Sequence, residues 1–294
     1  MANTDISVAS AIARQVRALG AKMDPDVAAA TRAIYRPNLD QSEAVVERVD
    51  VAYGPHARHR LDVYLPAAAS RAVVVFVHGG GFVAGDKNSD GVFYRNIGRW
   101  LARQGFAAVL PNYRLAPLAA WPAGAVDVQA VLHWVHDNRG ALGAQQLPPI
   151  VLWGQSAGAS HVASWLFDDA ARAGDPAQVS AVMMMSGFYA AEAPLFAEAR
   201  AYFGEDASLY EERSPVTHVK AKDVPIWLGV AELDPGWIAQ QTYLMARALT
   251  VAQGRSPDFH FFRGHNHVST VQSLGSAQHD AGEEVLRFLA TVAR

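Results

Sequence analysis

Gly154-Gln155-Ser156-Ala157-Gly158 follows directly on a short apolar run at 150–153. A serine hydroxyl is a weak nucleophile, and an enzyme that uses one places it on a sharp strand-to-helix turn, beside a base and backbone N–H donors. The two glycines lack a Cβ, which lets such a turn pack closely against the strand and the helix. This stretch therefore predicts a nucleophile elbow with Ser156 at its tip.

Short apolar runs alternate with amphipathic segments on both sides of this turn. The predicted buried strands cover 72–77, 106–110, 150–153, 179–185, 225–230 and 259–262, and two antiparallel edge strands precede them at 45–51 and 61–65. The predicted helices cover 93–103, 126–138, 157–172, 238–252 and 281–292. Continuous apolar strands separated by helices indicate an α/β fold with a mainly parallel sheet covered on both faces.

Two segments lie outside this alternation. Apolar residues at helical spacing within 5–35, with breaks at Gly20 and Pro25, predict two short helices ahead of the main fold. The stretch 189–219 is polar, contains aromatic residues and has no clear period, and we expect it to join the N-terminal helices as a lid. The predicted organisation is a helical cap segment at 1–44 and an α/β domain at 45–294, with a cap insertion at about 189–219.

The composition favours one large domain. The 294 residues are 51% apolar and 18% charged, which is enough for a sizeable core. A formal charge of -3, with charges scattered along the chain, gives no reason to expect nucleic acid or a membrane surface as a partner, and it favours small neutral substrates. The lack of cysteine excludes disulfides and cysteine nucleophiles. The start of the chain lacks a signal-peptide pattern, and we expect a soluble, cytoplasmic protein.

A second glycine motif, His78-Gly79-Gly80-Gly81-Phe82, follows the predicted strand at 72–77. Serine attack on an ester creates a tetrahedral oxyanion, and successive glycines allow backbone N–H groups to converge on it. A plain glycine-rich turn is the alternative, while a phosphate-binding loop is disfavoured because the GxGxxG spacing and a Walker lysine are both lacking. We expect the N–H groups of Gly80, Gly81 and Ala157 to form an oxyanion hole.

Two more motifs, Asn112-Tyr113-Arg114-Leu115-Ala116-Pro117 and Glu232-Leu233-Asp234-Pro235, complete a recognisable set. Together the four motifs resemble those of the hormone-sensitive-lipase-like carboxylesterases, from about residue 61 to the C-terminus. The resemblance implies an α/β-hydrolase fold, with a mainly parallel eight-stranded sheet, flanking helices and a small helical cap. It also implies carboxylic ester hydrolysis without a metal or an organic cofactor. The elbow has Gln155 where that group usually has aspartate, and so is more similar to feruloyl-esterase-like and kynurenine-formamidase-like hydrolases.

The acid of a catalytic triad on this fold follows the serine in the chain and lies just after a late strand. Asp234 meets both conditions and precedes a proline that fixes the loop. Asp223 and Glu232 are the alternatives. Asp223 precedes the strand and so lies at its wrong end, while Glu232 is the weaker match to the Asp-Pro pattern of the resembled family.

The base is expected in the loop 263–269, after the last predicted strand, where His265 and His267 both occur. In the resembled families the histidine is followed by one apolar and one small polar residue, as His267 is by Val268 and Ser269. We therefore predict His267 as the base and keep His265 as the alternative. A metal site built on both histidines is disfavoured because no carboxylate lies nearby at ligand spacing.

These residues predict a serine esterase mechanism. His267 takes the proton of Ser156, and Asp234 holds the imidazole. We expect short- to medium-chain or aryl carboxylic esters as small-molecule substrates, with Phe82 and Phe188 at the mouth of an apolar pocket. An amidase or formamidase is the alternative suggested by the elbow, and a ligand-binding protein without activity is another. A monomer and a homodimer are both compatible with the resemblance.

Overall fold

The computed structural model describes residues 2–40, 45–143, 148–172, 174 and 176–293. Within these residues, an eight-stranded sheet has the strand order β1-β2-β4-β3-β5-β6-β7-β8. Strand β2 pairs antiparallel with both β1 and β4, and every other neighbouring pair is parallel. The strands are β1 (Val46–Ala52), β2 (Arg60–Leu65), β3 (Val73–Val77), β4 (Ala107–Pro111), β5 (Ile150–Gln155), β6 (Ala181–Met185), β7 (Ile226–Leu233) and β8 (Asp258–Asn266). The prediction of a mainly parallel eight-stranded sheet is confirmed.

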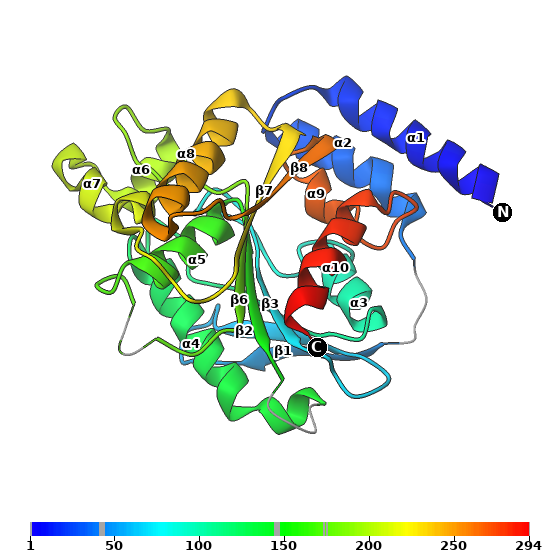
Figure 1. Cartoon of the computed structure of the whole chain (residues 1–294), viewed down its shortest axis with the longest axis horizontal. Helices are drawn as coiled ribbons and strands as arrows, with labels where there is room; N and C mark the ends of the chain where they lie inside the picture. Colours follow the sequence, from blue (N-terminus) through cyan, green and yellow to red (C-terminus); the bar gives the residue numbers. More distant parts are fainter. Residues whose placement is uncertain (1, 41–44, 144–147, 173, 175, 294) are drawn as a thin grey trace.

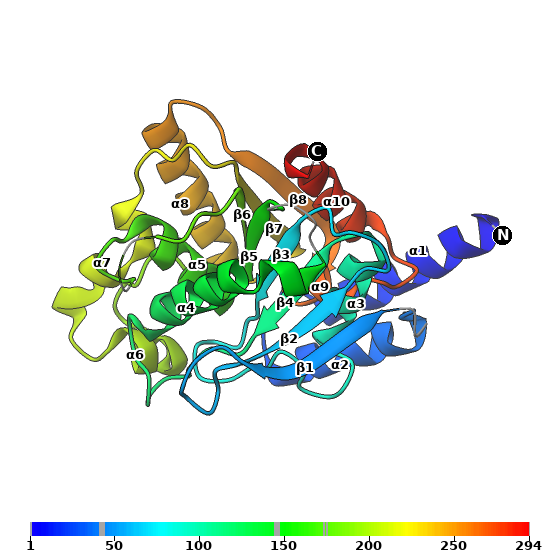
Figure 2. The same cartoon turned by 90° about the horizontal axis from the view of Figure 1, so that it is seen from below.

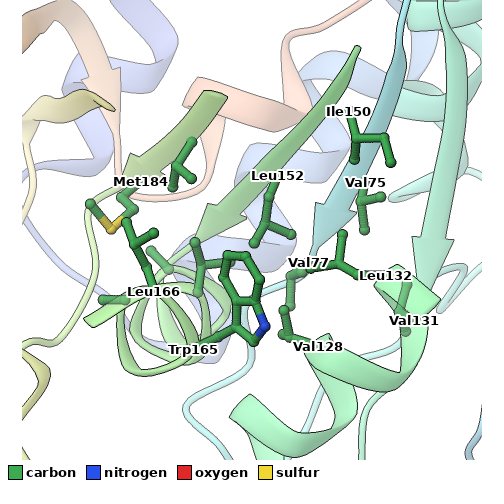
Figure 3. Close-up of a cluster of buried hydrophobic side chains, with 14 of the residues drawn as sticks. Val75, Val77, Val128, Val131, Leu132, Ile150, Leu152, Trp165, Leu166 and Met184 are labelled. Carbon is green, nitrogen blue, oxygen red and sulfur yellow. The ribbon is translucent and has the colours of Figure 1, made fainter. Parts of the chain in front are cut away.

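Helices cover both faces of the sheet because successive strand residues point to opposite sides (Figures 1 and 2). Val75 faces a cluster that also contains residues of three helices, α4 (Ala123–Asp137), α5 (Ala157–Phe167) and α8 (Gly236–Gln253). Figure 3 shows part of this cluster, with Trp165 of α5 beside Leu152 of β5. Val74 faces the opposite cluster, with residues of α3 (Arg95–Arg103) and α10 (Asp280–Val292).

The observed helices differ from the predicted ones mainly at their ends. Helix α5 was expected to reach residue 172 but ends at Phe167, because Asp168 is extended and its Oδ1 accepts a hydrogen bond from the N–H of Ala170. Helix α4 begins three residues earlier than expected, directly after Pro122. Short helical turns at η1 (Arg36–Asn38), η2 (Arg139–Leu142) and α9 (Ser269–Gln272) were not predicted.

The segment 189–219 is also helical, although its sequence shows no period. It contains α6 (Ala197–Phe203), η3 (Ala207–Leu209), α7 (Tyr210–Arg213) and η4 (Pro215–His218). These elements have three to seven residues each, which is too short for a periodic pattern to emerge. Aromatic packing holds the segment, with Tyr202 and Phe203 buried against Phe82 and Phe188.

The two N-terminal helices are α1 (Ala2–Leu19) and α2 (Pro25–Tyr35), and they lie beside the ends of β7 and β8 (Figure 1). As predicted, the helices are separated at Gly20 and Pro25, but α1 has 18 residues and is not short. Helix α2 is held by two buried hydrogen bonds, from Asn266 Nδ2 to Thr31 Oγ1 at 2.9 Å and from Tyr35 to Gln278 at 2.7 Å. Helix α2 is therefore fixed beside the carboxyl end of β8.

Candidate active site

Ser156 lies between the last residue of β5 and the first residue of α5. Its backbone angles, a φ of 55° and a ψ of -126°, belong to a region that residues other than glycine rarely adopt. The turn is pinned by a 2.9 Å hydrogen bond from the Ser156 N–H to the carbonyl of Met185. A Cβ on Gly158 would collide with the Val77 carbonyl, and one on Gly154 would lie 2.5 Å from the Gly158 carbonyl oxygen. The glycine spacing is thus required by close backbone contact around a strained serine.

The structure brings Ser156, His267 and Asp234 together in one chain of hydrogen bonds. His267 Nε2 lies 2.8 Å from Ser156 Oγ, and His267 Nδ1 lies 2.7 Å from Asp234 Oδ1. The three residues follow β5, β8 and β7, whose carboxyl ends meet at the same edge of the sheet. His267 and Asp234 are both buried. This arrangement can move a proton from the serine to an imidazole that a carboxylate orients.

Ser186 is part of this network and was missed in the sequence. Its hydroxyl donates to Asp234 Oδ2 at 2.6 Å, and the N–H of Ala231 donates to the same oxygen at 2.8 Å. The two bonds fix the carboxylate and leave Oδ1 for His267. Ser186 comes directly after β6, which lies between β5 and β7. Its position after a predicted strand was the signal that could have identified it.

The alternative acids have other partners. Glu232 forms an ion pair with Arg17 of α1 at 2.7 Å and accepts a hydrogen bond from the N–H of Gly264 at 2.5 Å. This backbone donor and the arginine hold the pKa of Glu232 below its usual range. Asp223 precedes β7 and, with Lys222, lines a separate cavity of about 540 Å³ that contains none of the predicted site residues. Neither acid contacts His267.

The alternative base, His265, is buried and belongs to a separate cluster of side chains. Its Nδ1 lies 3.0 Å from Ser269 Oγ, and its Nε2 lies 3.2 Å from Asp280 and 3.0 Å from the amide of Gln278. His265 does not contact Ser156, although it does have a carboxylate partner. That partner, Asp280, lies 15 residues further along the chain. The search for a carboxylate at ligand spacing near His265 in the sequence could therefore not find it.

The glycine loop passes directly over the serine. A Cβ on Gly79 would lie 2.9 Å from the Ser156 Cβ, and Gly80 and Gly81 have φ values of 139° and 59°. Among the described residues, no acceptor is bonded to the backbone N–H of Gly80, Gly81 or Ala157. These three donors are therefore free to bind an oxyanion at the serine.

The Asn112–Pro117 motif packs against the glycine loop and forms hydrogen bonds with it. Tyr113 stacks on His78 with ring centroids 4.4 Å apart, and its hydroxyl donates to the His78 carbonyl at 3.0 Å. The N–H of Ala116 donates to the carbonyl of Phe82 at 3.0 Å. Burial lowers the pKa of His78 to about 4, so that the ring is neutral near neutral pH. The motif thus fixes both ends of the glycine loop.

Gln155 connects the elbow to the loop that carries the base. Its side chain is buried, and its Nε2 donates to the backbone carbonyl of His267 at 2.9 Å. Aspartate, which the resembled esterases usually have here, cannot donate this bond when it is ionised. The glutamine therefore positions His267 as well as lining the cavity beside it.

A cavity of about 440 Å³ lies beside Ser156 and His267. One wall is the glycine loop, and another is formed by Met23, which precedes α2, and by Pro25, Ala28 and Arg32 of α2. The predicted substrate contacts differ from this: Phe82 and Phe188 are buried and do not line the cavity. Phe82 has a φ of 71°, and its ring stacks on Tyr202 of α6 at 4.7 Å. Its side chain is thus used to hold the segment 189–219.

Within the described ranges, histidine, aspartate and glutamate side chains form no group of three or more that could hold a metal ion. The expectation that no metal is needed stays a prediction. No described helix combines the length and the apolar character needed to cross a membrane.

Curated relatives to which this chain is similar include proteins named as esterases. Esterase LipQ of Mycobacterium tuberculosis is 26% identical over 240 residues, which cover 72% of this chain and 56% of LipQ. Isoprenylcysteine alpha-carbonyl methylesterase ICME of Arabidopsis thaliana is 32% identical over 127 residues, which cover 42% of this chain and 29% of the relative. The chain therefore matches about half of the length of the first relative and under a third of the second.

Solved structures share the fold over nearly the whole chain. Esterase B from Lactobacillus rhamnosis has a TM-score of 0.75 at 20% identity, with 100% of this chain and 97% of that chain covered. A hyperthermophilic esterase from the archaeon Pyrobaculum calidifontis has a TM-score of 0.67 at 21% identity, with 97% and 96% covered. The predicted α/β-hydrolase fold is confirmed, while the hormone-sensitive-lipase-like subgroup stays a prediction.

Two family models match overlapping parts of the sequence. The BD-FAE model matches residues 61–168, which include the glycine loop and the elbow. The model of the prolyl oligopeptidase family matches residues 124–294, more than half of the chain, and this range includes Ser156, Asp234 and His267. The chain belongs to the prolyl oligopeptidase family and has the α/β-hydrolase fold.

Proposed function

We propose that the protein is a serine carboxylesterase in which Ser156 is the nucleophile, His267 the general base and Asp234 the orienting acid. The observation that carries the proposal is the hydrogen-bond chain Ser156–His267–Asp234, which opens onto a cavity beneath three free backbone N–H groups. Each part of acyl transfer to serine has a residue in position: a nucleophile, a base, an orienting carboxylate and oxyanion donors.

In the first half-reaction, His267 Nε2 accepts the Ser156 proton while Oγ attacks the ester carbonyl. Asp234 keeps the proton of His267 on Nδ1, so that Nε2 is free to accept, and it stabilises the imidazolium that forms. The N–H groups of Gly80, Gly81 and Ala157 bind the tetrahedral oxyanion, and each such donor contributes about 2.7–4 kcal/mol in comparable sites. His267 then protonates the leaving alcohol, and an acyl-Ser156 ester remains.

The second half-reaction returns the enzyme to its starting state. His267 removes a proton from a water molecule, and the hydroxide attacks the carbonyl of the acyl-enzyme. The same N–H groups bind the second oxyanion. Collapse of this intermediate releases the carboxylic acid, while His267 returns the proton to Ser156. Apart from the substrate and this water molecule, every group in the sequence belongs to a residue already described.

We propose short- to medium-chain or aryl esters as the substrate class. A cavity of about 440 Å³ has the size of a small-molecule site, and most of its wall near the serine is backbone or apolar. The esterase names of the relatives favour ester bonds as well. We extend the proposal to a cytoplasmic protein that is a monomer or a homodimer, which light scattering of the purified protein can distinguish.

Amide hydrolysis is the second candidate, because the chain belongs to a family named after a peptidase. A panel of p-nitrophenyl esters of increasing acyl length, together with an aryl amide and N-formylkynurenine, separates the two activities. The proposal expects kcat/KM for the best ester to exceed that for both amides. A preference for the aryl amide or the formamide would overturn the esterase assignment while keeping the serine mechanism.

A further inference from the structure

Helix α2 forms one wall of the cavity and is rigidly held beside the base. Thr31 is fully buried, and its hydroxyl oxygen accepts a hydrogen bond from Asn266, the residue before His267. Tyr35, one turn further along α2, is bonded to Gln278. Side chains of α2 that face the cavity are therefore held at a fixed distance from Ser156.

Two acidic side chains and one arginine side chain line the cavity: Asp24, Asp86 and Arg32. The two carboxylates are occupied by bonds within the protein. Asp24 caps α2 by accepting from the N–H of Val27 at 2.8 Å. Asp86 accepts from the N–H of Asn88 at 2.8 Å and from the amide of Asn112 at 2.6 Å. Both acids therefore have structural roles.

Arg32 differs from both acids and from its neighbour on the same helix. Over the residues that the structure describes, no carboxylate lies within ion-pair distance of Arg32, and its guanidinium makes no hydrogen bond. Arg36, one turn further along, is paired with Asp90 at 2.6 Å. Arg32 is half-buried, so that this cation lacks a partner although it has lost part of its contact with water.

The charge of Arg32 acts inside the cavity. Tyr94 lines the same cavity, and burial raises its pKa to about 12, while the positive charge of Arg32 works in the opposite direction. Apolar side chains of Met23, Ala28 and Val268 make up much of the surrounding wall. A charge beside such a wall attracts an anion more strongly than one in open water.

We propose that the ester cleaved at Ser156 carries an anionic group, a carboxylate, which pairs with Arg32 of α2. This inference rests on the proposed esterase function and narrows its substrate class. It departs from the neutral substrates that the overall charge of the chain favours, because Arg32 is a cation in the cavity wall without a carboxylate partner, whereas the two carboxylates of the wall already accept hydrogen bonds from the protein. A guanidinium binds a carboxylate through paired hydrogen bonds, which would also orient the substrate.

The test compares anionic esters with neutral esters of the same length. On the acyl side, the pair is mono-p-nitrophenyl adipate and p-nitrophenyl hexanoate. On the alcohol side, the pair is 4-carboxyphenyl hexanoate and phenyl hexanoate. The quantity measured is the ratio of kcat/KM for the anionic ester to that for the neutral ester, in wild-type protein and in variants. The two pairs show on which side of the ester bond the carboxylate lies.

Arg32→Gln is expected to lower this ratio by about tenfold in at least one of the two pairs, as the loss of one charged hydrogen bond would. Arg32→Lys is expected to lower the ratio less than Arg32→Gln does, because lysine keeps the positive charge. Arg36→Gln is the matched control, with an arginine removed from the same helix at a position outside the cavity, and it should leave the ratio unchanged. Added salt should reduce the wild-type ratio.

Equal ratios in wild type and Arg32→Gln for both pairs would overturn the inference, as would an equal loss in Arg36→Gln. If wild type hydrolyses the neutral esters but shows no dependence on Arg32, the anion preference fails and the esterase function stands. If wild type hydrolyses none of the four esters, the proposed function itself fails and the inference falls with it.

Discussion

Two clusters of serine, histidine and aspartate are built on His265 and His267 at the end of β8, and we propose that only the cluster of His267 is catalytic. His267 contacts Ser156 and Asp234, while His265 contacts Ser269 and Asp280. Both histidines are buried. In each, one ring nitrogen lies within hydrogen-bond distance of a serine hydroxyl, and the other lies within hydrogen-bond distance of an aspartate carboxylate. Residue types and contacts alone therefore do not distinguish a catalytic cluster from a structural one.

The difference lies in the backbone and in access. Ser156 has a positive φ that exposes its hydroxyl to the cavity beneath the glycine loop. Ser269 is fully buried, and its Oγ accepts a hydrogen bond from the N–H of Asn266 at 2.9 Å. The exposure of the two carboxylates differs in the opposite sense to that of the two serines: the Asp234 side chain is 0% exposed, and that of Asp280 is 55% exposed. The second cluster instead joins α10 to the end of β8 and, through Gln278 and Tyr35, to α2.

Replacement of the two serines should give the largest contrast. Ser156→Ala is expected to lower kcat by at least about 10⁴-fold, because no other hydroxyl is in position to attack. Ser269→Ala should keep turnover near the wild-type level and lower the free energy of unfolding by about 1–3 kcal/mol, since it leaves buried partners unsatisfied. Steady-state kinetics and urea denaturation of both variants measure the two effects. Substantial turnover by Ser156→Ala would place the nucleophile elsewhere.

Replacement of the two aspartates should give the next largest contrast. Asp234→Asn is expected to lower kcat by about 10⁴-fold, because an amide no longer keeps the His267 proton on Nδ1. Asp280→Asn acts on a histidine that does not contact the nucleophile, and its kcat should stay close to that of wild type. If both variants lost a similar amount of kcat while the same fraction of each protein was folded, the proposed difference between the two clusters would be wrong.

Acid should affect the structural cluster through Asp280. Partial burial alone would raise the pKa of Asp280, but the hydrogen bond and charge of His265 outweigh this effect and hold that pKa below its usual value. A carboxyl with a lowered folded-state pKa stabilises the protein above its unfolded-state pKa, and this stability is lost as the pH falls through the folded-state value. Wild type should therefore lose unfolding free energy more steeply than Asp280→Asn below about pH 4. Parallel curves from urea denaturation would contradict this assignment.

Gln155 should give the smallest effect. Gln155→Met keeps the size of the side chain but loses the bond to the His267 carbonyl, and kcat is expected to fall by about two- to tenfold. Because the bond positions the base and does not bind substrate, KM should change little. Gln155→Glu, which can donate only when protonated, should recover part of kcat at low pH relative to Gln155→Met. A change confined to KM would instead make Gln155 a substrate contact.

The elements that the sequence predicted correctly follow from local patterns. The eight strands are apolar runs bounded by turns, and the contacts of Ser156 follow from the rule that loops after parallel strands meet at one edge. The same rule excluded Asp223, while the resemblance to known esterases selected Asp234 over Glu232 and His267 over His265. These predictions needed no knowledge of how distant segments pack.

The features that the sequence could not reveal depend on contacts between distant segments. Arg17 and Glu232, which hold α1 at the site, are 215 residues apart, and Thr31 and Asn266 are 235 apart. No local pattern placed Arg32 in the wall of the cavity. Phe82 was expected at the mouth of the pocket, but its ring stacks on Tyr202, and its backbone has a positive φ. Side-chain direction after a glycine-rich turn is not encoded in the motif.

The claim that only one of the two clusters is catalytic can be tested by labelling the folded protein with a fluorophosphonate and mapping the adduct by peptide mass spectrometry. A fluorophosphonate reacts with a serine that a neighbouring base activates. We predict one adduct on Ser156, its loss in His267→Ala, and no adduct on Ser269. An adduct on Ser269, or an active folded protein that remains unlabelled at Ser156, would contradict the account.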